Sequence, residues 1–244
     1  IKCRKAGLHP DAVVLVATTK ALKMHGGVKK EDLQQENVKA VIAGCENLGR
    51  HIRNIGQYGV PVVVAINDYV TDTKQEHQAI IDYCQQFDVA CKISSHWSDG
   101  GKGAEALAMH VASMIENQQS QFRTLYDDDM KLWDKARHIA RTIYGAEDII
   151  ADKKVRAQFE RFENEGYGHY PVCMAKTQYS FSTDPQLTGA PSGHDVPIRE
   201  IRLAAGAEFI VIVCGDVMTM PGLPRKPASE NIGVDNLKNI TGLF

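Results

Sequence analysis

The chain has 244 residues, of which 43% are hydrophobic and 24% are charged, and its formal net charge is −2. This is the composition of a globular protein with room for one large domain or two small ones. The lack of basic excess argues against a nucleic-acid partner. No apolar run approaches the roughly 18 residues of a membrane span and no signal peptide is recognisable, so we expect a cytoplasmic protein without a membrane partner.

The first half of the chain alternates strand and helix signals. In chain order we expect a strand at 12–17, a helix at 32–56, a strand at 62–66, a helix at 74–86, a strand at 89–94 and a helix at 104–117. Thr73 and Glu76 have the spacing of a capping box at the start of the second helix. Such alternation predicts an α/β fold with a parallel sheet and right-handed crossovers.

The second half has a different pattern, with denser glycine and proline. Helices are expected at 130–144 and 152–165, each followed by glycine, and strands at 171–175, 198–203 and 208–214. The chain starts at Ile1 and reaches a buried-strand run within a dozen residues, which suggests that it starts inside a larger fold. We therefore expect residues 1–50 to be the end of one domain and residues 51–244 to form a second α/β domain.

The six cysteines are scattered without a CxxC pair. Two of them, Cys45 and Cys214, lie near apolar runs, and buried reduced thiols are the simplest interpretation. No two Cys or His have the spacing of zinc ligands, so we expect no metal site.

Two aromatic residues follow two of the expected strands. Asn67, Asp68 and Tyr69 come directly after the strand at 62–66, while His96 and Trp97 follow the strand at 89–94. Ligands of open parallel sheets bind beyond the carboxyl ends of the strands. If the two strands are neighbours, or separated by one strand, both rings rise from one edge and could hold a flat heteroaromatic ligand between them. The alternative is that both rings pack in the core.

The polar neighbours of these rings also have two interpretations. Asn67 and Asp68 are typical turn residues, although the Asp68 carboxylate could instead accept hydrogen bonds from an amino-bearing heterocycle. His96 and His25, both in loops after strands, could be acid–base groups or hydrogen-bonded structural residues.

The segment Gly100-Gly101-Lys102-Gly103 does not fit a phosphate-binding loop. The pattern GxxxxGK[ST] requires glycine five positions before Gly101, where the chain has His96, and Ser or Thr at residue 103. No other segment fits it, so the chain carries no P-loop. Polar loops at 174–182, 189–194 and 218–224 are further candidates for function. Arg199 and Arg202 flank Glu200, where an internal ion pair and a ligand contact are equally compatible with the sequence.

Together these motifs resemble one family, the ATP-dependent formate–tetrahydrofolate ligases. The similar segments are collinear and extend over nearly the whole chain: ATTKALKMHGG (17–27), PVVVAINDYVTDT (61–73), HWSDGGKG (96–103), LYDDDMKLWDKARHIARTIYGA (125–146), GYGHYPVCMAKTQYSFSTDP (166–185), PIREIRLAAGAEFIV (197–211), MTMPGLPRKPA (218–228) and the closing ITGLF. The resemblance implies a Rossmann-like, parallel-sheet α/β domain on the folate side, preceded by the tail of a P-loop nucleotide-binding domain.

The resemblance also implies a reaction. ATP phosphorylates formate to formyl phosphate, and N10 of tetrahydrofolate attacks it to give 10-formyltetrahydrofolate, ADP and phosphate. Magnesium accompanies ATP, monovalent cations activate family members, and the bacterial enzymes are usually homotetramers. The P-loop and the arginine that holds formyl phosphate would lie upstream of Ile1, so the catalytic residues would be outside this chain. We expect the chain alone to be inactive. A non-catalytic folate- or nucleotide-binding module is the alternative.

Residue roles carry over to the matching positions. Tyr69 and Trp97 would stack on the pterin ring, with Asn67, Asp68 and His96 as pocket neighbours. The family often has Phe where this chain has Tyr69, so the added hydroxyl needs a partner, and often Pro where the chain has Val70.

A second set of roles concerns the nucleotide. Pro191, Ser192 and Gly193 would form part of the adenine surround.

Overall fold

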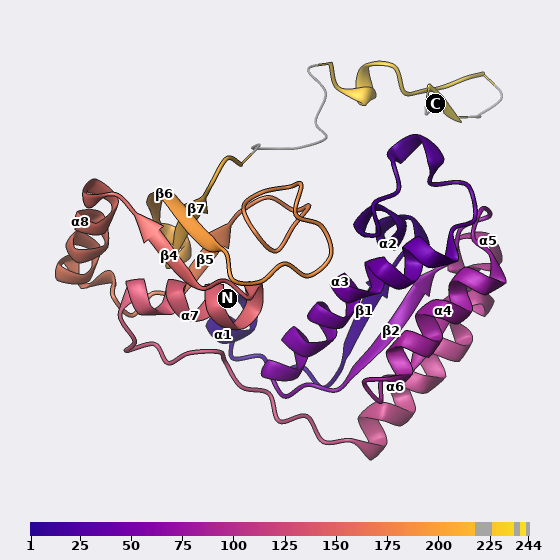
Figure 1. The fold of residues 1–244 in the computed structure, drawn as a ribbon, viewed down its shortest axis with the longest axis horizontal. Helices are drawn as coiled ribbons and strands as arrows, with labels where there is room; N and C mark the ends of the chain where they lie inside the picture. Colours follow the sequence, from indigo (N-terminus) through magenta and orange to yellow (C-terminus); the bar gives the residue numbers. More distant parts are fainter. Residues whose placement is uncertain (218–225, 237–239, 243–244) are drawn as a thin grey trace.

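The computed structural model describes residues 1–217, 226–236 and 240–242. Figure 1 shows two lobes, each built on its own sheet. We call residues 11–117 the first lobe. The second lobe comprises residues 124–217 together with the short helix α1 (Lys2–Ala6), and residues 118–123 connect the two. The polar loop at 218–224 and the last two residues of the closing motif lie outside the described residues.

The first lobe contains a three-stranded parallel sheet, as the sequence predicts. Its strands are β1 (Val13–Ala17), β2 (Val62–Asn67) and β3 (Cys91–Ser94), in the order β1-β2-β3. Runs of β-branched residues favour strands that are covered on both faces, and the middle of β2 is buried throughout. The surrounding helices are α2 (Thr19–His25), α3 (Val38–Gln57), α4 (Lys74–Gln85), α5 (His96–Asp99) and α6 (Glu105–Asn117).

The helix expected at 32–56 is shorter at its start. It begins at Val38 because the Asn37 side chain accepts a hydrogen bond from the Ala40 amide at 3.0 Å and caps the helix there. A separate helix, α2, precedes it and was not expected. The two helices pack closely, and a Cβ added to Gly44 would lie 1.8 Å from the Leu22 carbonyl oxygen. Glycine is therefore required at this crossing.

The capping box expected at the start of α4 is confirmed. The Glu76 amide donates to the Thr73 hydroxyl at 3.3 Å, and the Thr73 amide donates to the Glu76 carboxylate at 3.2 Å. This reciprocal pair fixes the first turn of α4 immediately after β2 and its loop.

The second lobe contains a mixed sheet. Its strands are β4 (Asp148–Ala151), β5 (Val172–Ala175), β6 (Asp195–Ala204) and β7 (Phe209–Cys214), in the order β4-β6-β7-β5. β6 and β7 are antiparallel, whereas the other pairs are parallel. The helices are α7 (Leu132–Tyr144) and α8 (Lys153–Phe162). α8 ends earlier than expected because a π-helical turn at Glu163–Tyr167 follows, with Gly166 at φ 91°.

The remaining elements are short. Single 3-10 turns occur at Lys30–Asp32, Gly100–Ala104, Ala205–Ala207 and Ala228–Glu230, and β8 (Gly233–Val234) pairs antiparallel with β9 (Ile240–Thr241). In the described part of the chain, no helix is both long enough and apolar enough to cross a membrane.

The division expected at residue 50 falls inside α3. Leu48 and Ile52, on its two sides, belong to the same hydrophobic core, and β1 pairs with β2 across the division. A second core lies around α7, α8 and the mixed sheet. The structure therefore groups residues 11–117 into one lobe, because the first strand completes its sheet with strands that follow residue 50.

Candidate functional site

The two candidate loops leave the same edge of the first-lobe sheet. β2 and β3 are neighbours, with Asn67 opposite Ser94, which is one of the two arrangements that the sequence left open. The Asp68 amide then donates to the Ser94 carbonyl at 3.1 Å, which continues the ladder by one residue beyond β2. Because adjacent strands are about 5 Å apart, the chains that carry Tyr69 and Trp97 leave the sheet close together.

Neither ring packs in a core. The exposed fraction of Tyr69 is 43% and that of Trp97, on α5, is 83%, so the alternative of two core aromatics does not hold. The Tyr69 hydroxyl accepts a hydrogen bond from the Asn67 amide at 3.3 Å, which provides a partner for that hydroxyl. The Lys20 ammonium lies 4.6 Å from the centre of the Tyr69 ring, as a cation–π contact.

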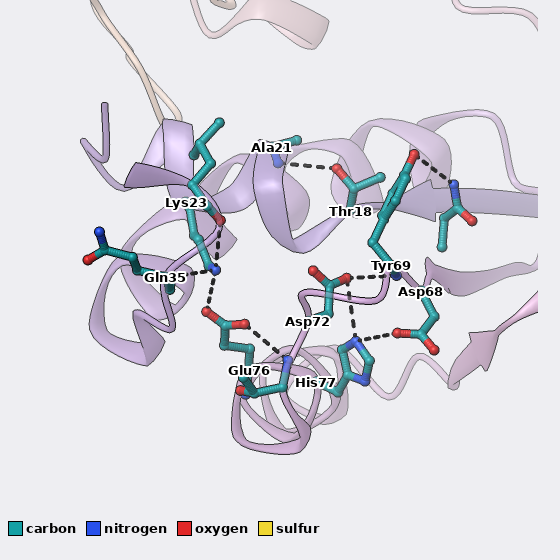
Figure 2. A network of polar contacts seen from close by, with 12 residues as sticks. Thr18, Ala21, Lys23, Gln35, Asp68, Tyr69, Asp72, Glu76 and His77 are labelled. Carbon is teal, nitrogen blue, oxygen red and sulfur yellow. Dashed lines mark hydrogen bonds and ion pairs between the residues drawn. The ribbon is translucent and has the colours of Figure 1, made fainter. Parts of the chain in front are cut away.

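The loop that carries Tyr69 is a closed polar turn. The Tyr69 amide donates to the Asp72 carboxylate at 3.2 Å, and the Asp72 amide donates to the Tyr69 carbonyl at 2.8 Å. Figure 2 shows His77 pointing from α4 toward Asp68 and Asp72. Its Nε2 atom lies 3.4 Å from Asp68 Oδ1 and 3.7 Å from Asp72 Oδ2, which are charge contacts rather than short hydrogen bonds.

These contacts shift two pKa values in opposite directions. The pKa of His77 is raised, first because the Asp72 carboxylate favours the protonated ring and further because Asp68 and Glu76 add negative charge, against the opposing effect of burial. Burial alone would raise the pKa of Asp72, but its contacts with His77, Thr19 and the Tyr69 amide outweigh burial and lower it. The charged forms of both groups are therefore favoured.

Asp68, Asp72 and His77 are also the group, among the described residues, whose potential ligand atoms lie within 4.8 Å of one another. A protonated imidazole between two carboxylates already balances much of their charge. We therefore interpret the group as a charge-paired triad.

A buried ion pair lies under this loop. The Lys23 ammonium is 2.6 Å from the Glu76 carboxylate, and both side chains are fully buried. The same ammonium donates to the carbonyls of Leu33 at 3.1 Å and Gln35 at 2.7 Å. This contact joins α2 to the first turn of α4, which also carries His77.

Sequence reasoning missed four of these residues: Lys20, Lys23, Asp72 and His77. Helix register offered one signal, since a helix that starts after Thr73 places His77 in its first turns, near the preceding loop. No pattern in the sequence indicated the two lysines of α2, because α2 itself was not predicted.

The two candidate histidines lie in different places. His96 lies at the Tyr69–Trp97 edge, with its Nδ1 atom 3.1 Å from the Ser94 hydroxyl. His25 instead accepts a hydrogen bond from the Gly189 amide of the second lobe at 3.2 Å, and burial lowers its pKa. His25 is thus a structural residue that joins the two lobes.

The Gly100–Ala104 turn closes the loop that carries Trp97. The Ser95 amide donates to the Gly103 carbonyl at 3.1 Å, and a Cβ at Gly103 would lie 2.5 Å from the Ser95 carbonyl carbon. This close packing explains the glycine without a phosphate ligand.

The loop proposed for adenine docks against α3. Asn47 donates to the Gly189 carbonyl at 2.9 Å and Arg50 to the Ala190 carbonyl at 3.4 Å. Further along the same loop, the Gly193 amide donates to the Gly145 carbonyl at 2.9 Å, and Pro191 and Ser192 lie between these anchors.

A cavity of about 360 Å³ lies between the lobes in this region. It is lined by residues that include His51, Tyr144, Lys176 and Phe181. Burial lowers the pKa of Lys176 to about 8.

The arginines near Glu200 form ion pairs. Arg202 pairs with Glu200, and Arg199 lies 3.2 Å from Asp216. All six cysteines are free thiols, and Cys45, Cys84 and Cys214 are buried.

Comparisons with known proteins agree with the sequence motifs. The family model described as formate–tetrahydrofolate ligase matches residues 1–244. Over the whole chain, the sequence is 57% identical to the formate–tetrahydrofolate ligase of Ruegeria pomeroyi, 58% identical to that of Sinorhizobium medicae and 56% identical to that of Granulibacter bethesdensis. The chain covers 44%, 43% and 43% of those relatives, respectively, and so spans less than half of their length.

Proposed function

Because this chain belongs to the formate–tetrahydrofolate ligase family, we propose that it supplies the folate-binding side of an enzyme that joins formate to tetrahydrofolate at the expense of ATP. The observation that carries this proposal is the placement of Tyr69 and Trp97 beyond the ends of two adjacent parallel strands, both exposed. The product would be 10-formyltetrahydrofolate, formed through formyl phosphate.

The pterin ring would bind between the two aromatic side chains. Each stacking contact contributes about 0.5–1.5 kcal/mol beyond the burial of apolar area. The Lys20 ammonium can stay on one face of the Tyr69 ring while the ligand occupies the other. One oxygen of Asp68 faces His77, which leaves its second oxygen to accept a hydrogen bond from the amino group of the pterin.

His96 and Asn67 would line the same pocket. Asn67 holds the Tyr69 hydroxyl and so limits rotation of that ring. His96 lies on the side of Trp97, within hydrogen-bond distance of Ser94.

The ATP side of the reaction fits this chain only in part. Its sequence has no GxxxxGK[ST] segment, and its one Gly-Lys pair lies in the Gly100–Ala104 turn, which is closed by Ser95. No residue of this chain is therefore assigned to the phosphates or to Mg²⁺. Pro191, Ser192 and Gly193, in a loop fixed against α3, would contribute to the adenine surround.

The chain alone should give no ligase turnover, because phosphoryl transfer depends on positioning and charge neutralisation at the phosphates. We further propose that the intact enzyme acts in the cytoplasm, as a homotetramer activated by monovalent cations.

The proposal is tested by replacing Trp97 with Ala in the intact protein. Losing one stacked ring should weaken tetrahydrofolate binding by roughly 1–3 kcal/mol, that is, raise its KM about 5- to 150-fold. The KM for ATP should stay within about twofold. The matched control is Trp133→Phe, because Trp133 packs against Phe159 in the core of the second lobe. A folate KM that is unchanged in Trp97→Ala would refute the pocket.

A further inference from the structure

His77, on α4, contacts two residues of the loop that carries Tyr69. Tyr69 lies between two carboxylates, Asp68 and Asp72, and His77 contacts both of them. We propose that His77 is a positioning residue for tetrahydrofolate, which fixes the Tyr69 ring by bridging Asp68 and Asp72 with a protonated imidazole. This inference rests on the proposed function, since it assigns a further residue to the same pocket.

Asp72 controls the backbone at Tyr69. Its carboxylate accepts the Tyr69 amide at 3.2 Å, while its own amide donates to the Tyr69 carbonyl at 2.8 Å. Rotation of the Asp72 side chain therefore breaks the hydrogen bond of the Tyr69 amide and leaves the loop with only the backbone bond between Asp72 and Tyr69. The ring has no core packing to hold it, because 43% of Tyr69 is exposed. Its orientation depends on these polar contacts, on the hydrogen bond from Asn67 and on the cation–π contact with Lys20.

The position of His77 is fixed by its helix. It lies in the first turns of α4, whose start is fixed by the capping box of Thr73 and Glu76. Glu76 is in turn anchored to α2 through the buried Lys23 ammonium at 2.6 Å. The imidazole is thus attached to the scaffold of the lobe, whereas the two carboxylates that it contacts belong to a loop (Figure 2).

The side chains of this bridge are buried or partly buried. The side chains of His77 and Asp72 are 9% and 0% exposed, and that of Asp68 is 32% exposed. Charge contacts at such sites are less screened by water and salt than those between surface side chains. The bridge is therefore less screened than a surface ion pair, although its distances of 3.4 and 3.7 Å make it weaker than a short charge-assisted hydrogen bond.

The charges around His77 make its protonation matter. Asp68 and Asp72 face the ring from the loop, and Glu76 adds negative charge from α4, although Lys23 of α2 balances Glu76. With the proton present, the triad has one positive and two negative groups. When His77 loses its proton, the two carboxylates, whose ligand atoms are within 4.8 Å of His77 and of each other, lose this positive charge and repel each other more strongly, while Asp72 keeps its neutral contacts with Thr19 and the Tyr69 amide.

This repulsion weakens the hold of Asp72 on Tyr69, and a less preorganised ring binds its ligand less tightly. The pKa of His77 is raised above its ordinary value of 6.5, so the bridge is complete below pH 6.5 and is lost as the pH rises through the raised value. Tetrahydrofolate affinity should follow the same course.

The experiment compares the tetrahydrofolate Kd of the intact protein from pH 5.5 to pH 9, under anaerobic conditions, in wild type, His77→Gln and His77→Lys. At pH 6, His77→Gln should bind roughly 3- to 10-fold more weakly than wild type, and at pH 9 the two should converge. His77→Lys keeps a positive charge up to higher pH and should bind more tightly than wild type at pH 9. His110→Gln, which changes a histidine of α6 away from the triad, is the matched control and should follow wild type.

Four results would overturn the inference. The first is equal pH profiles of wild type and His77→Gln, provided that Tyr69→Ala weakens folate. The second is a His77→Lys variant that is no better than His77→Gln at pH 9, because a purely structural role would not depend on charge. The third is a change in wild-type affinity on adding ZnCl₂ or EDTA that is absent in His77→Gln, which would make the triad a metal site. The fourth is a His77→Gln variant that does not fold, together with a His77→Lys variant whose pH profile equals that of wild type. If instead Tyr69→Ala and Trp97→Ala both leave folate binding unchanged, the proposed function fails first.

Discussion

Removing the ammonium of Lys23 should destabilise the first lobe by about 3–5 kcal/mol, because it leaves a charge buried without its partner. Lys23→Met preserves much of the side-chain volume but removes the contact with Glu76 at 2.6 Å and the hydrogen bonds to the carbonyls of Leu33 and Gln35. Glu76 would keep only its contacts with two backbone amides, those of Asn37 at 2.8 Å and Thr73 at 3.2 Å.

The double variant Lys23→Met, Glu76→Gln separates charge from packing. It leaves no buried charge without a partner, so it should be more stable than Lys23→Met alone, by about 1–3 kcal/mol. Lys29→Met, at an exposed lysine near the end of α2, is the control and should change stability by less than about 0.5 kcal/mol.

Urea unfolding measures these differences. The two lobes have separate cores and need not unfold together. A Trp133→Phe background leaves Trp97 as the fluorescent reporter of the first lobe. With a slope of about 1–3 kcal/mol per molar urea, the Lys23→Met midpoint should fall by at least about 1 M. A loss below about 1 kcal/mol, or a double variant that is less stable than Lys23→Met, would refute the reasoning.

Two other predictions concern packing and pH. Gly44→Ala places a Cβ 1.8 Å from the Leu22 carbonyl oxygen and should lower the free energy of unfolding in urea by about 1–3 kcal/mol. Gly56→Ala, on the same helix with open space around the new Cβ, should leave stability unchanged or raise it. Equal effects of the two substitutions would contradict the close crossing of α2 and α3. Burial lowers the pKa of Lys176 to about 8 from 10.5, so the unfolded chain binds this proton more tightly than the folded chain does. The free energy of unfolding should therefore increase as the pH rises from about 8 to 10.5. Relative to wild type, Lys176→Met should lose that rise in Tm, while the exposed Lys154→Met should keep it; a Tm profile of Lys176→Met parallel to wild type would count against the assigned cause.

Local signals predicted much of the first lobe. The β-branched runs at β1 and β2 predicted both strands, although only β2 is covered on both faces: β1 is an edge strand whose Val14 and Val16 are exposed. Thr73 with Glu76 specified the start of α4 to within one residue. Topology predicted that the two aromatic loops leave one edge of the sheet, because consecutive parallel strands present their carboxyl ends there. The role of the two rings in binding a pterin came from the family resemblance and stays a prediction.

The missed elements depend on tertiary contacts. α2 has seven residues, too few for a helix to be stable without packing, and it forms against α3. β4 has four residues and pairs with β6, which lies far away in sequence.

The site residues were missed for the same reason, because their roles depend on tertiary contacts. His77 and Lys23 acquire their partners only when α2, α4 and the Tyr69 loop come together. No spacing along the sequence predicts that α2, α4 and the Tyr69 loop contact one another.

The two crossings between the lobes lie side by side. The Ser120 hydroxyl donates to the Pro10 carbonyl at 2.7 Å, and the Gln121 amide donates to the Gly59 carbonyl at 2.9 Å, so the chain leaves the first lobe next to the point where it enters. The two covalent connections therefore meet at one corner, and a rotation of the lobes about that corner would change the cavity lined by His51 and Phe181. The hydrogen bond from Asn54 to the Ile143 carbonyl at 2.9 Å, that from Gly189 to His25 and those of the loop at 189–193 with α3 resist such a rotation.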